Sequence, residues 1–572
     1  MRRIIIIVAF TLAAPAYAGP IAPPAGPVAP THKTLTEVEP RTAINATNTP
    51  GDGTSTFIIA QSGSYYLAGD TTGDPGKRGI TIDAPNVTID LNGFTLQGPA
   101  SSGDGIYSSI NASSSITIKN GTVRDWGASG ISFNFGFVLD QAVTIEHVTA
   151  NDNGLYGIYT YSIGTIINDC AANKNGESGI VVFKNAIVSR CVAESNGFVG
   201  AFPSAGFVAD SHCILTDCSA IGNAYYGFIL EFVCILERCN AQINFEDGFI
   251  ENGNGSKFIS CAATTNLGMG YNLGGKNNIV ACTAAGQGIG FALGDHSVVT
   301  DCLTTTAGTG FGGAAAVPES VQFNNCQASD GGNGFGVGSD CSFTACVANA
   351  NATGFIVAAN AHFQGCSAKG NTQNGFVAAA NAQFHDCAAN GNTQNGFVAA
   401  ANAQFHDCAA NGNIIGFVID SGTLDSCTAA ENSGVGFSLG SGSAATGCVA
   451  RLNGAEGLVL ADDSFVNDCL STNNTGYGIL IAGSRNVVRN SHFSYNGQLP
   501  APSGSEGIFI SGDFNRIDGN SVVQNNGTAM RVSGQRNFVV RTTSAFNAGG
   551  IVDAGVANTI GSAADPWANF NH

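Results

Sequence analysis

Apolar positions recur along this chain with a period of about 21 residues, and each recurrence has the same internal order. A glycine precedes an apolar or aromatic residue, a short apolar run follows, and the unit closes on Cys-x-Ala-x-x-Asn. The pattern is plainest in residues 371–391, whose letters are repeated without change in residues 392–412. A fixed period of this length indicates one structural coil per repeat.

The content of each unit favours strands over helices. Gly, Asn and β-branched or aromatic residues are frequent, and no stretch is long enough for two helices. In residues 392–412, the segments GFVAA, AQFH and CAA predict three short strands, with bends at Asn402, near His406–Asp407 and around Asn411. Coils of three strands that stack about 4.8 Å apart form a parallel β-helix. This apolar position, preceded by the repeated glycine everywhere except at Met530, occurs 22 times from Ile80 to Ile551. We therefore expect an all-β, single-stranded solenoid of about 22 coils.

Two further positions repeat in the same register. Fifteen repeats place a cysteine at one equivalent position, from Cys170 to Cys469, and most place an asparagine five residues later. Like side chains stacked on like would fill the interior evenly, and stacked amides can hydrogen-bond along the rod. Asparagine tolerates the left-handed backbone of a tight bend, and the glycine permits the bend that opens the next strand. We interpret all these positions as structural.

The chain has 18 cysteines, which in an exported protein would usually suggest disulfides. Side chains stacked about 4.8 Å apart are too distant for a disulfide, whose Cβ atoms lie nearer to about 3.8 Å. We therefore expect buried free thiols that act as small apolar fillers. Cys213 and Cys234 lie outside the main register and 21 residues apart, so a bridge between them stays open. No Cys-x-x-Cys pair indicates a zinc site.

The ends of the chain differ from the repeats. Residues 1–18 read as a signal peptide, with Arg2 and Arg3 before an apolar run and Ala-Tyr-Ala at the cleavage site. Residues 19–50 are expected to form a Pro/Ala-rich lead-in and N-terminal cap, residues 51–560 the β-helix, and residues 561–572 a C-terminal cap. No later segment has the apolar length of a membrane span. We expect an exported monomer, either secreted or periplasmic.

The formal net charge of −19 restricts the partners. Nucleic acid is disfavoured, because no basic stripe is present to neutralise phosphates. The charge also weighs against polyanionic sugars, although calcium could bridge acid to acid. We predict no cofactor and leave calcium as an open alternative.

Several segments carry a family resemblance. They are KTLTEVEPRTAI, SGSYYLAGD, NVTIDLNGFTLQG, ITIKNGTVRDWGASGI and the closing ADPWANF. These phrases resemble a group of exported bacterial right-handed parallel β-helix repeat proteins in the pectin-lyase-like class, over nearly the whole chain after the signal peptide. The resemblance implies the right hand of the coil, which the period alone does not show. The group has no settled activity, so the resemblance implies little about function.

Enzymes of this fold class act on polysaccharides, and their sequence signatures are missing here. Asn-Thr-Asp, Gly-His-Gly and Arg-Ile-Lys of polygalacturonase-like enzymes do not occur, nor does Asp-Pro-His-Asp of alginate-epimerase-like ones. His385–Asp386 and His406–Asp407 could suggest a metal or acid–base site. They are copies within a duplicated unit, so we interpret them as exposed bend residues and predict no metal site.

If a groove exists, the N-terminal coils are the favoured place. Longer coils over residues 106–207 leave room for loops, and aromatic rings there offer flat faces for sugars. The candidates are Asp125, Trp126, Tyr159, Lys184 and Arg190, with Tyr156 and Tyr161 nearby. The competing interpretation is that these side chains are solvated coil edges.

Two functions stay open at this point. The favoured one is a non-catalytic exported rod that binds or displays at the cell surface or on extracellular glycan. The alternative is a polysaccharide lyase or glycoside hydrolase with its groove on the N-terminal coils. A third interpretation, an accessory protein for metal-site assembly, rests on fold kinship alone, because no Met or His cluster supports it.

Overall fold

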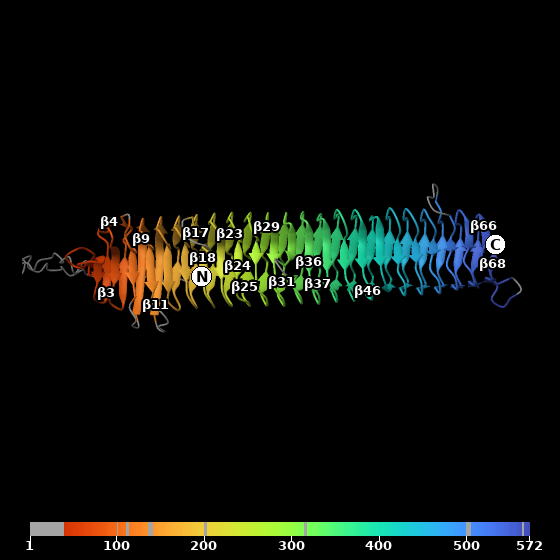
Figure 1. The fold of residues 1–572 in the computed structure, drawn as a ribbon, viewed down its shortest axis with the longest axis horizontal. Helices are drawn as coiled ribbons and strands as arrows, with labels where there is room; N and C mark the ends of the chain where they lie inside the picture. The colour runs from red at the N-terminus through yellow and green to blue at the C-terminus, as the bar shows by residue number, and fades with distance from the viewer. Residues whose placement is uncertain are drawn as a thin grey trace, which may run out of the picture.

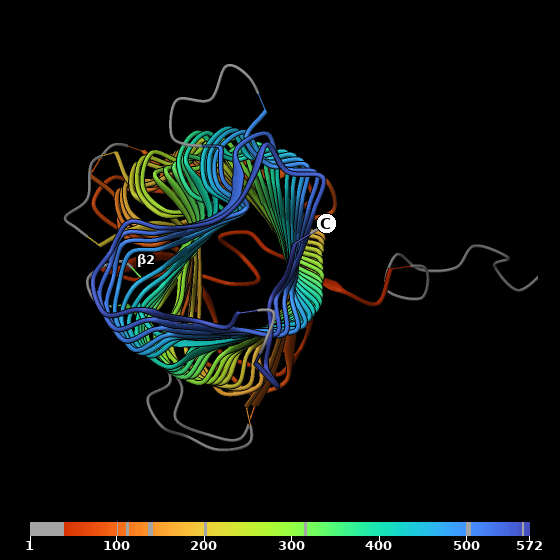
Figure 2. The ribbon, with the colours of Figure 1, turned by 90° about the vertical axis from the view of Figure 1, so that its right-hand side faces the viewer.

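The chain forms an elongated rod of stacked coils (Figure 1). The computed structural model describes residues 39–99, 101–109, 114–134, 141–198, 203–313, 317–498, 505–562 and 565–571. Over these residues there are 68 strands and no helix. One parallel sheet has 23 strands and the other has 45. Figure 2 looks down the rod and shows successive coils superposed.

Most coils contribute one strand to the 23-stranded sheet and two to the 45-stranded sheet, whereas two early coils contribute one long strand, β9 (Ser114–Arg124) or β11 (Gln141–Asn151), to the latter. In the duplicated unit the three strands are β45 (Asn395–Ala399), β46 (Ala403–His406) and β47 (Ala409–Asn411). The backbone is left-handed at Asn402 and Asp407, with φ of 61° and 52°. The three predicted strands and their bends are therefore confirmed for this unit.

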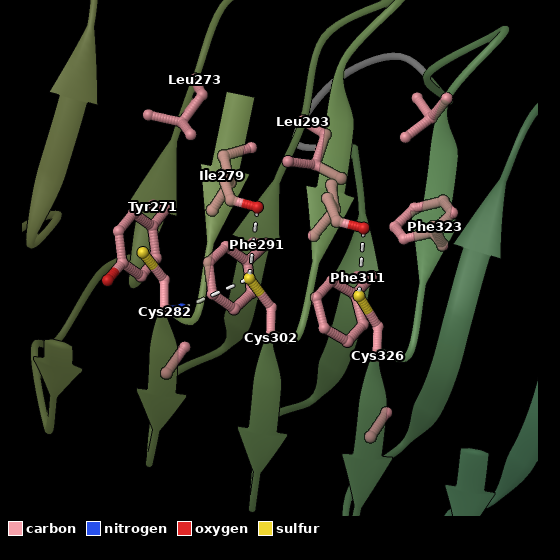
Figure 3. Packing of buried hydrophobic residues seen from close by; sticks show 14 of the residues in the cluster. Tyr271, Leu273, Ile279, Cys282, Phe291, Leu293, Cys302, Phe311, Phe323 and Cys326 are labelled. Atoms are coloured by element: carbon pink, nitrogen blue, oxygen red, sulfur yellow. Dashed lines mark hydrogen bonds between the residues drawn. The ribbon is translucent and has the colours of Figure 1, made fainter. Parts of the chain in front are cut away.

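The interior contains columns of like side chains. Aromatic rings from Phe207 to Phe437 stack on successive coils with centroids 4.4–5.1 Å apart. Cysteines line the adjacent column, as Figure 3 shows for Cys282, Cys302 and Cys326. All 18 cysteines are buried and free, which confirms the prediction of unpaired thiols.

The open alternative of a Cys213–Cys234 bridge is wrong. Both side chains are free thiols. The Cys213 thiol donates to the carbonyl oxygen of Phe183 at 3.1 Å, and the Cys234 thiol donates to that of Asp210 at 3.1 Å. Each sulfur thus has a backbone acceptor in the coil before it.

The buried asparagines form a hydrogen-bonded column, as the sequence predicts. The Asn392 Nδ2 donates to Oδ1 of Asn413 at 3.0 Å and to the carbonyl oxygen of Ala368 at 3.2 Å. The backbone conformation differs from the prediction, because the left-handed residue is the preceding Gly391 with φ of 63°. The asparagine itself is selected for its amide, which satisfies an N–H and a carbonyl group of the preceding coil and bonds to the asparagine side chain of the next.

The repeated glycine also has a different reason from the predicted one. Gly396 is not left-handed, and a Cβ there would lie 2.7 Å from the carbonyl oxygen of Gly416 and 2.9 Å from Nδ2 of Asn413. Any side chain would therefore collide with the next coil. Close approach between coils, and not a bend, requires glycine at this position.

The 23 strands of the first sheet exceed the 22 coils predicted. The additional coil begins with β2 (Ser55–Ile59), in which Phe57 pairs with Ile80 of β5 (Arg78–Ile82). Thr56 stands where 21 of the other 22 coils have glycine, so the repeat pattern misses this one. The predicted signal peptide, residues 1–18, lies outside the described residues. No helix that could span a membrane is found in the part of the chain that the structure describes.

Candidate functional site

A groove lies on the outer face of the 23-stranded sheet, where the early coils turn toward the second sheet. Its floor comes from β12 (Ile158–Tyr161), β15 (Ile180–Val182) and β18 (Ala205–Ala209). These strands are in parallel register, so the outward side chains of Tyr159 and Val181 are neighbours. Strand alternation buries the residues on either side of them.

We call this site the aromatic groove. It has a volume of about 610 Å³. Its lining residues are Tyr159, Thr160, Tyr161, Val181, Val182, Phe183, Lys184, Val208, Asp210, Ser211, Glu231 and Phe232. A volume of this size matches a small-molecule or oligosaccharide site.

Four aromatic residues, Tyr159, Tyr161, Phe183 and Phe232, contribute to the lining of the groove, although Phe183 itself is largely buried. The rings of Tyr161 and Phe183 lie 4.2 Å apart between centroids, and Lys184 Nζ lies 5.2 Å from the Phe183 centroid. Tyr156 stacks on Tyr159 at 5.1 Å and extends the aromatic surface beyond the groove. Phe232, on the turn that follows β21 (Tyr226–Leu230), is 47% exposed.

The charged groups of the groove are one amine and two carboxylates. Lys184 is the amine, and Asp210 and Glu231 lie on successive coils, since Glu231 N donates to the carbonyl oxygen of Ala209. Asp210 Oδ1 accepts a hydrogen bond from Ser211 Oγ at 2.8 Å. Glu231 Oε1 accepts one from Asn252 Nδ2 at 3.1 Å. The lining therefore has a slight excess of negative charge.

Tyr156 and Tyr159 are neutral hydrogen-bonding groups. Burial raises the pKa of Tyr159 above its usual value. Burial, with a hydrogen bond to Glu177, raises the pKa of Tyr156 further. Both phenols stay protonated at neutral pH, so they can donate to a ligand but cannot act as bases.

Two stretches of the chain, residues 78–234 and 401–493, match the family model described as a right handed beta helix region. The chain is a right-handed parallel β-helix. This match and the parallel sheets confirm the predicted fold and its right hand. No curated protein matches the chain.

Solved structures similar to this β-helix include three carbohydrate-active proteins. Pectate lyase Pel9A shares 16% identity over 52% of this chain and 72% of its own, with a TM-score of 0.22. The PL6 family alginate lyase AlyGC shares 9% sequence identity over 90% of this chain and 97% of its own, with a TM-score of 0.23. The Azotobacter vinelandii mannuronan C-5 epimerase AlgE4 A-module shares 10% sequence identity over 89% of this chain and 91% of its own, with a TM-score of 0.14. At these identities the similarity concerns the fold alone.

The β-helix places only two of the five predicted groove residues in the aromatic groove, namely Tyr159 and Lys184. The prediction for Trp126 is wrong, because its side chain is 1% exposed and its ring cannot stack on a sugar. The Trp126 Nε1 donates to the carbonyl oxygen of Leu96 at 3.2 Å inside the β-helix.

Arg190 and Asp125 lie outside the groove lining. Arg190 occupies the left-handed bend between the two strands that its coil adds to the 45-stranded sheet. Its Nε and Nη2 each lie 2.7 Å from a carboxylate oxygen of Asp169, which holds the pKa of that carboxyl below its usual value. Asp125 pairs with Arg124 at 3.1 Å and accepts a hydrogen bond from Gln97.

Sequence reasoning missed Phe183, Asp210, Glu231 and Phe232 as groove residues. Phe183, Asp210 and Glu231 directly follow a strand of the 23-stranded sheet, and Phe232 comes next after Glu231, at the turn toward the other sheet. The 21-residue spacing of Asp210 and Glu231 was a usable signal, because one period places residues on adjacent coils at the same corner.

The duplicated histidines are surface residues. His406 and Asp407 are exposed, with His406 Nδ1 2.9 Å from Asp407 Oδ2, while His385 is half-buried. The His385 and His406 rings lie 5.8 Å apart between centroids. Among the described residues, no group of three or more His, Cys, Asp or Glu side chains has a metal-binding arrangement.

Proposed function

We propose that this protein is an exported, non-catalytic β-helix that binds an uncharged extracellular or cell-surface glycan in its aromatic groove. The observation that carries the proposal is the cluster of Tyr159, Tyr161, Phe183 and Phe232 in one open groove. Sugars present apolar C–H faces that pack on aromatic rings, while a few polar groups fix their orientation. The groove offers both kinds of group.

Charge favours a neutral glycan over a polyuronate. Asp210 and Glu231 outnumber Lys184 in the lining, and the whole chain carries a formal charge of −19. A polyuronate would bring a carboxylate on each sugar into this field, and like charges repel. A neutral chain pays no such cost.

The same groups weigh against lyase chemistry. A lyase needs a base and a cation that neutralises the uronate carboxylate as the proton leaves. Lys184 is the single cationic residue of the groove lining that the structure describes. It cannot fill both roles at once.

A second candidate function is glycoside hydrolysis. Asp210 and Glu231 place two carboxyl groups on adjacent coils in one groove, and paired carboxyl groups are what most glycoside hydrolases use. Each carboxylate here already accepts a hydrogen bond from a neutral side chain. Product analysis separates this function from binding alone.

The test is a calorimetric binding screen against neutral and anionic polysaccharides, run with a reducing-end assay and an ultraviolet assay for unsaturated products. We expect binding of a neutral glycan without products, weakened about ten-fold or more by Tyr159→Ala or Phe232→Ala. Phe514→Ala is the matched control, because Phe514 is 52% exposed and lies outside the groove.

Three outcomes contradict the proposal. Tighter binding of a polyuronate would refute the choice of a neutral ligand. Products that disappear in Asp210→Asn or Glu231→Gln would establish the hydrolase. Equal binding by wild type and both groove variants would place the glycan elsewhere.

A further inference from the structure

Four isoleucines form an exposed column on the 45-stranded sheet, around the corner of the coil from the aromatic groove. They are the first residues of β13 (Ile166–Asn168), β16 (Ile187–Ser189), β19 (Ile214–Thr216) and β22 (Ile235–Glu237). The strands pair in register, so each isoleucine lies directly over the one before. Each is 37–43% exposed. We call this column the isoleucine ladder.

A column of alternating charge runs beside the isoleucine ladder. It consists of the residue that follows each of the four strands, in the order Asp169, Arg190, Asp217, Arg238. All four occupy left-handed bends, with φ of 52–55°. Arg190 binds Asp169 through two hydrogen bonds of 2.7 Å, and Arg238 binds Asp217 at 2.7 and 3.0 Å. We call this column the charge ladder.

The two ladders together are self-complementary under one particular symmetry. A two-fold axis along the strand direction, midway between the coils of Arg190 and Asp217, turns the rod end for end. Each column then faces itself in reverse order. Asp169 meets the partner's Arg238, and Arg190 meets the partner's Asp217. The isoleucine ladder meets the same apolar ladder of the partner.

We propose that this face binds a second copy of the chain in an antiparallel, two-fold symmetric dimer. An isologous interface requires a surface that is complementary to itself, and an alternating ladder of even length fulfils that requirement only when the copies run in opposite directions. In a parallel dimer at equal height, each charge would meet its own kind. This differs from the monomer expected from the sequence, and it does not depend on the proposed glycan function.

The size of the face sets the strength of the dimer. Four coils span about 19 Å along the rod, and three residues of strand span about 10 Å across it. The resulting contact of a few hundred Å² is well below the roughly 800 Å² per partner of a standard stable complex. The dimer is therefore weak, and its population depends on protein concentration.

The position of the axis predicts the shape of the dimer. The ladders occupy the fifth to eighth of the 23 coils, so the C-terminal parts of the two copies extend in opposite directions. Since 17 of the 23 coils lie on the C-terminal side of the axis, the dimer is about 160 Å long against about 110 Å for one copy. A parallel dimer would leave the length unchanged.

The test combines sedimentation velocity over a concentration series with small-angle scattering. We expect reversible dimers in the upper micromolar range whose longest dimension exceeds that of the monomer by about 50 Å. A protein that stays monomeric up to about 1 mM, or a dimer no longer than the monomer, would overturn the proposal.

Charge reversal makes the test specific. Arg190→Asp alone and Asp217→Arg alone each place like charges across the interface twice, so each should weaken self-association about ten-fold or more. An equimolar mixture of the two variants should dimerise again, because each altered residue then meets its opposite charge. Mixing cannot repair the ladder within either chain, so the restored dimer is an intermolecular signature.

The controls address folding and location. Circular dichroism and unfolding curves of both variants must show the folded rod before mixing. Arg485→Asp breaks another two-bond pair, with Asp463 at 2.6 and 2.7 Å on a distant coil, and should leave dimerisation unchanged. Failure of the mixture to dimerise, with both variants folded, would refute the interface.

Discussion

Trp126 and Asn153 occupy the same interior column of the rod. The backbone N of Trp126 donates to Oδ1 of Asn153 at 3.2 Å, the same bond that Asn153 makes to Asn175 in the next coil at 3.1 Å. Trp126 thus begins the buried asparagine column with an indole in place of an amide. Its burial is a consequence of register, and its contribution is to stability.

Replacing Trp126 should therefore destabilise the rod without acting directly on a ligand. We expect Trp126→Ala to lower the free energy of unfolding by about 3–5 kcal/mol, because a fully buried indole leaves a large cavity. Urea unfolding followed by circular dichroism measures the loss. Trp567→Ala is the control, since Trp567 is 49% exposed and should cost far less. A stable Trp126→Ala variant with reduced glycan binding would contradict this assignment.

The asparagine column predicts that replacing an inward-pointing asparagine lowers the free energy of unfolding more than replacing an outward-pointing one. Asn392 donates two hydrogen bonds and accepts two from Asn371, so Asn392→Ala leaves several buried backbone and amide groups unsatisfied. We expect a loss of about 2–4 kcal/mol in urea unfolding. Asn390→Ala, at an outward position two residues earlier, should cost less than about 1 kcal/mol. Equal effects at the two sites would argue against the column.

Close approach between coils predicts that two glycines respond differently to the same change. Gly396→Ala places a Cβ 2.7 Å from the carbonyl oxygen of Gly416. We expect it to lower the free energy of unfolding by about 1–3 kcal/mol. Gly288→Ala meets nothing within 4 Å and should be nearly neutral or slightly stabilising. Thermal unfolding of the pair measures the difference, and a neutral Gly396→Ala would show that the coils can separate.

Buried thiols predict a loss of stability at alkaline pH. Burial raises the pKa of Cys341 from 9.0 to about 11. The unfolded chain loses this proton near its ordinary pKa while the folded chain retains it, so unfolding releases protons above pH about 9. The stabilisation from the retained proton is complete below that pH and is lost as the pH rises toward 11.

Unfolding curves from pH 7 to 10.5 should show this decline, and it should be smaller in Cys341→Ala. Native protein should also resist thiol reagents at pH 8, whereas denaturant should expose all 18 cysteines. Rapid labelling of the folded protein, or fewer than 18 thiols after denaturation, would contradict the buried, unpaired state.

Much of the fold could be predicted from the sequence because the repeat is local. The pattern within 21 residues predicts which side chains point inward, where the backbone bends and which residue stacks on the next coil. The Phe, Cys and Asn columns follow from that register alone. The reasons given for Gly396 and Asn392 were incomplete, since steric contact and amide bonding between coils depend on distances that no single unit contains.

The candidate site was only partly predictable. Tyr159 and Lys184 were found by composition, but Trp126 was placed outside the rod because irregular coil lengths near residues 106–207 obscure the register there. Arg190 was assigned to the groove, but it lies at a left-handed bend of the 45-stranded sheet, outside the groove lining. Such bends decide to which face of the rod an outward side chain points. The spacing of residues along the sequence does not give the angles of these bends.

The sequence by itself determined the coil, its period and the identity of its interior columns, because these depend on contacts that repeat at a fixed spacing. Only the tertiary structure decided which bends share a face of the rod. Stacking brought Phe183, Asp210 and Phe232 into one groove and aligned Asp169 with Arg190 beside the isoleucine ladder. Those groupings join residues from different coils at one corner, and the bend angles that select the corner arise from backbone packing across the whole rod.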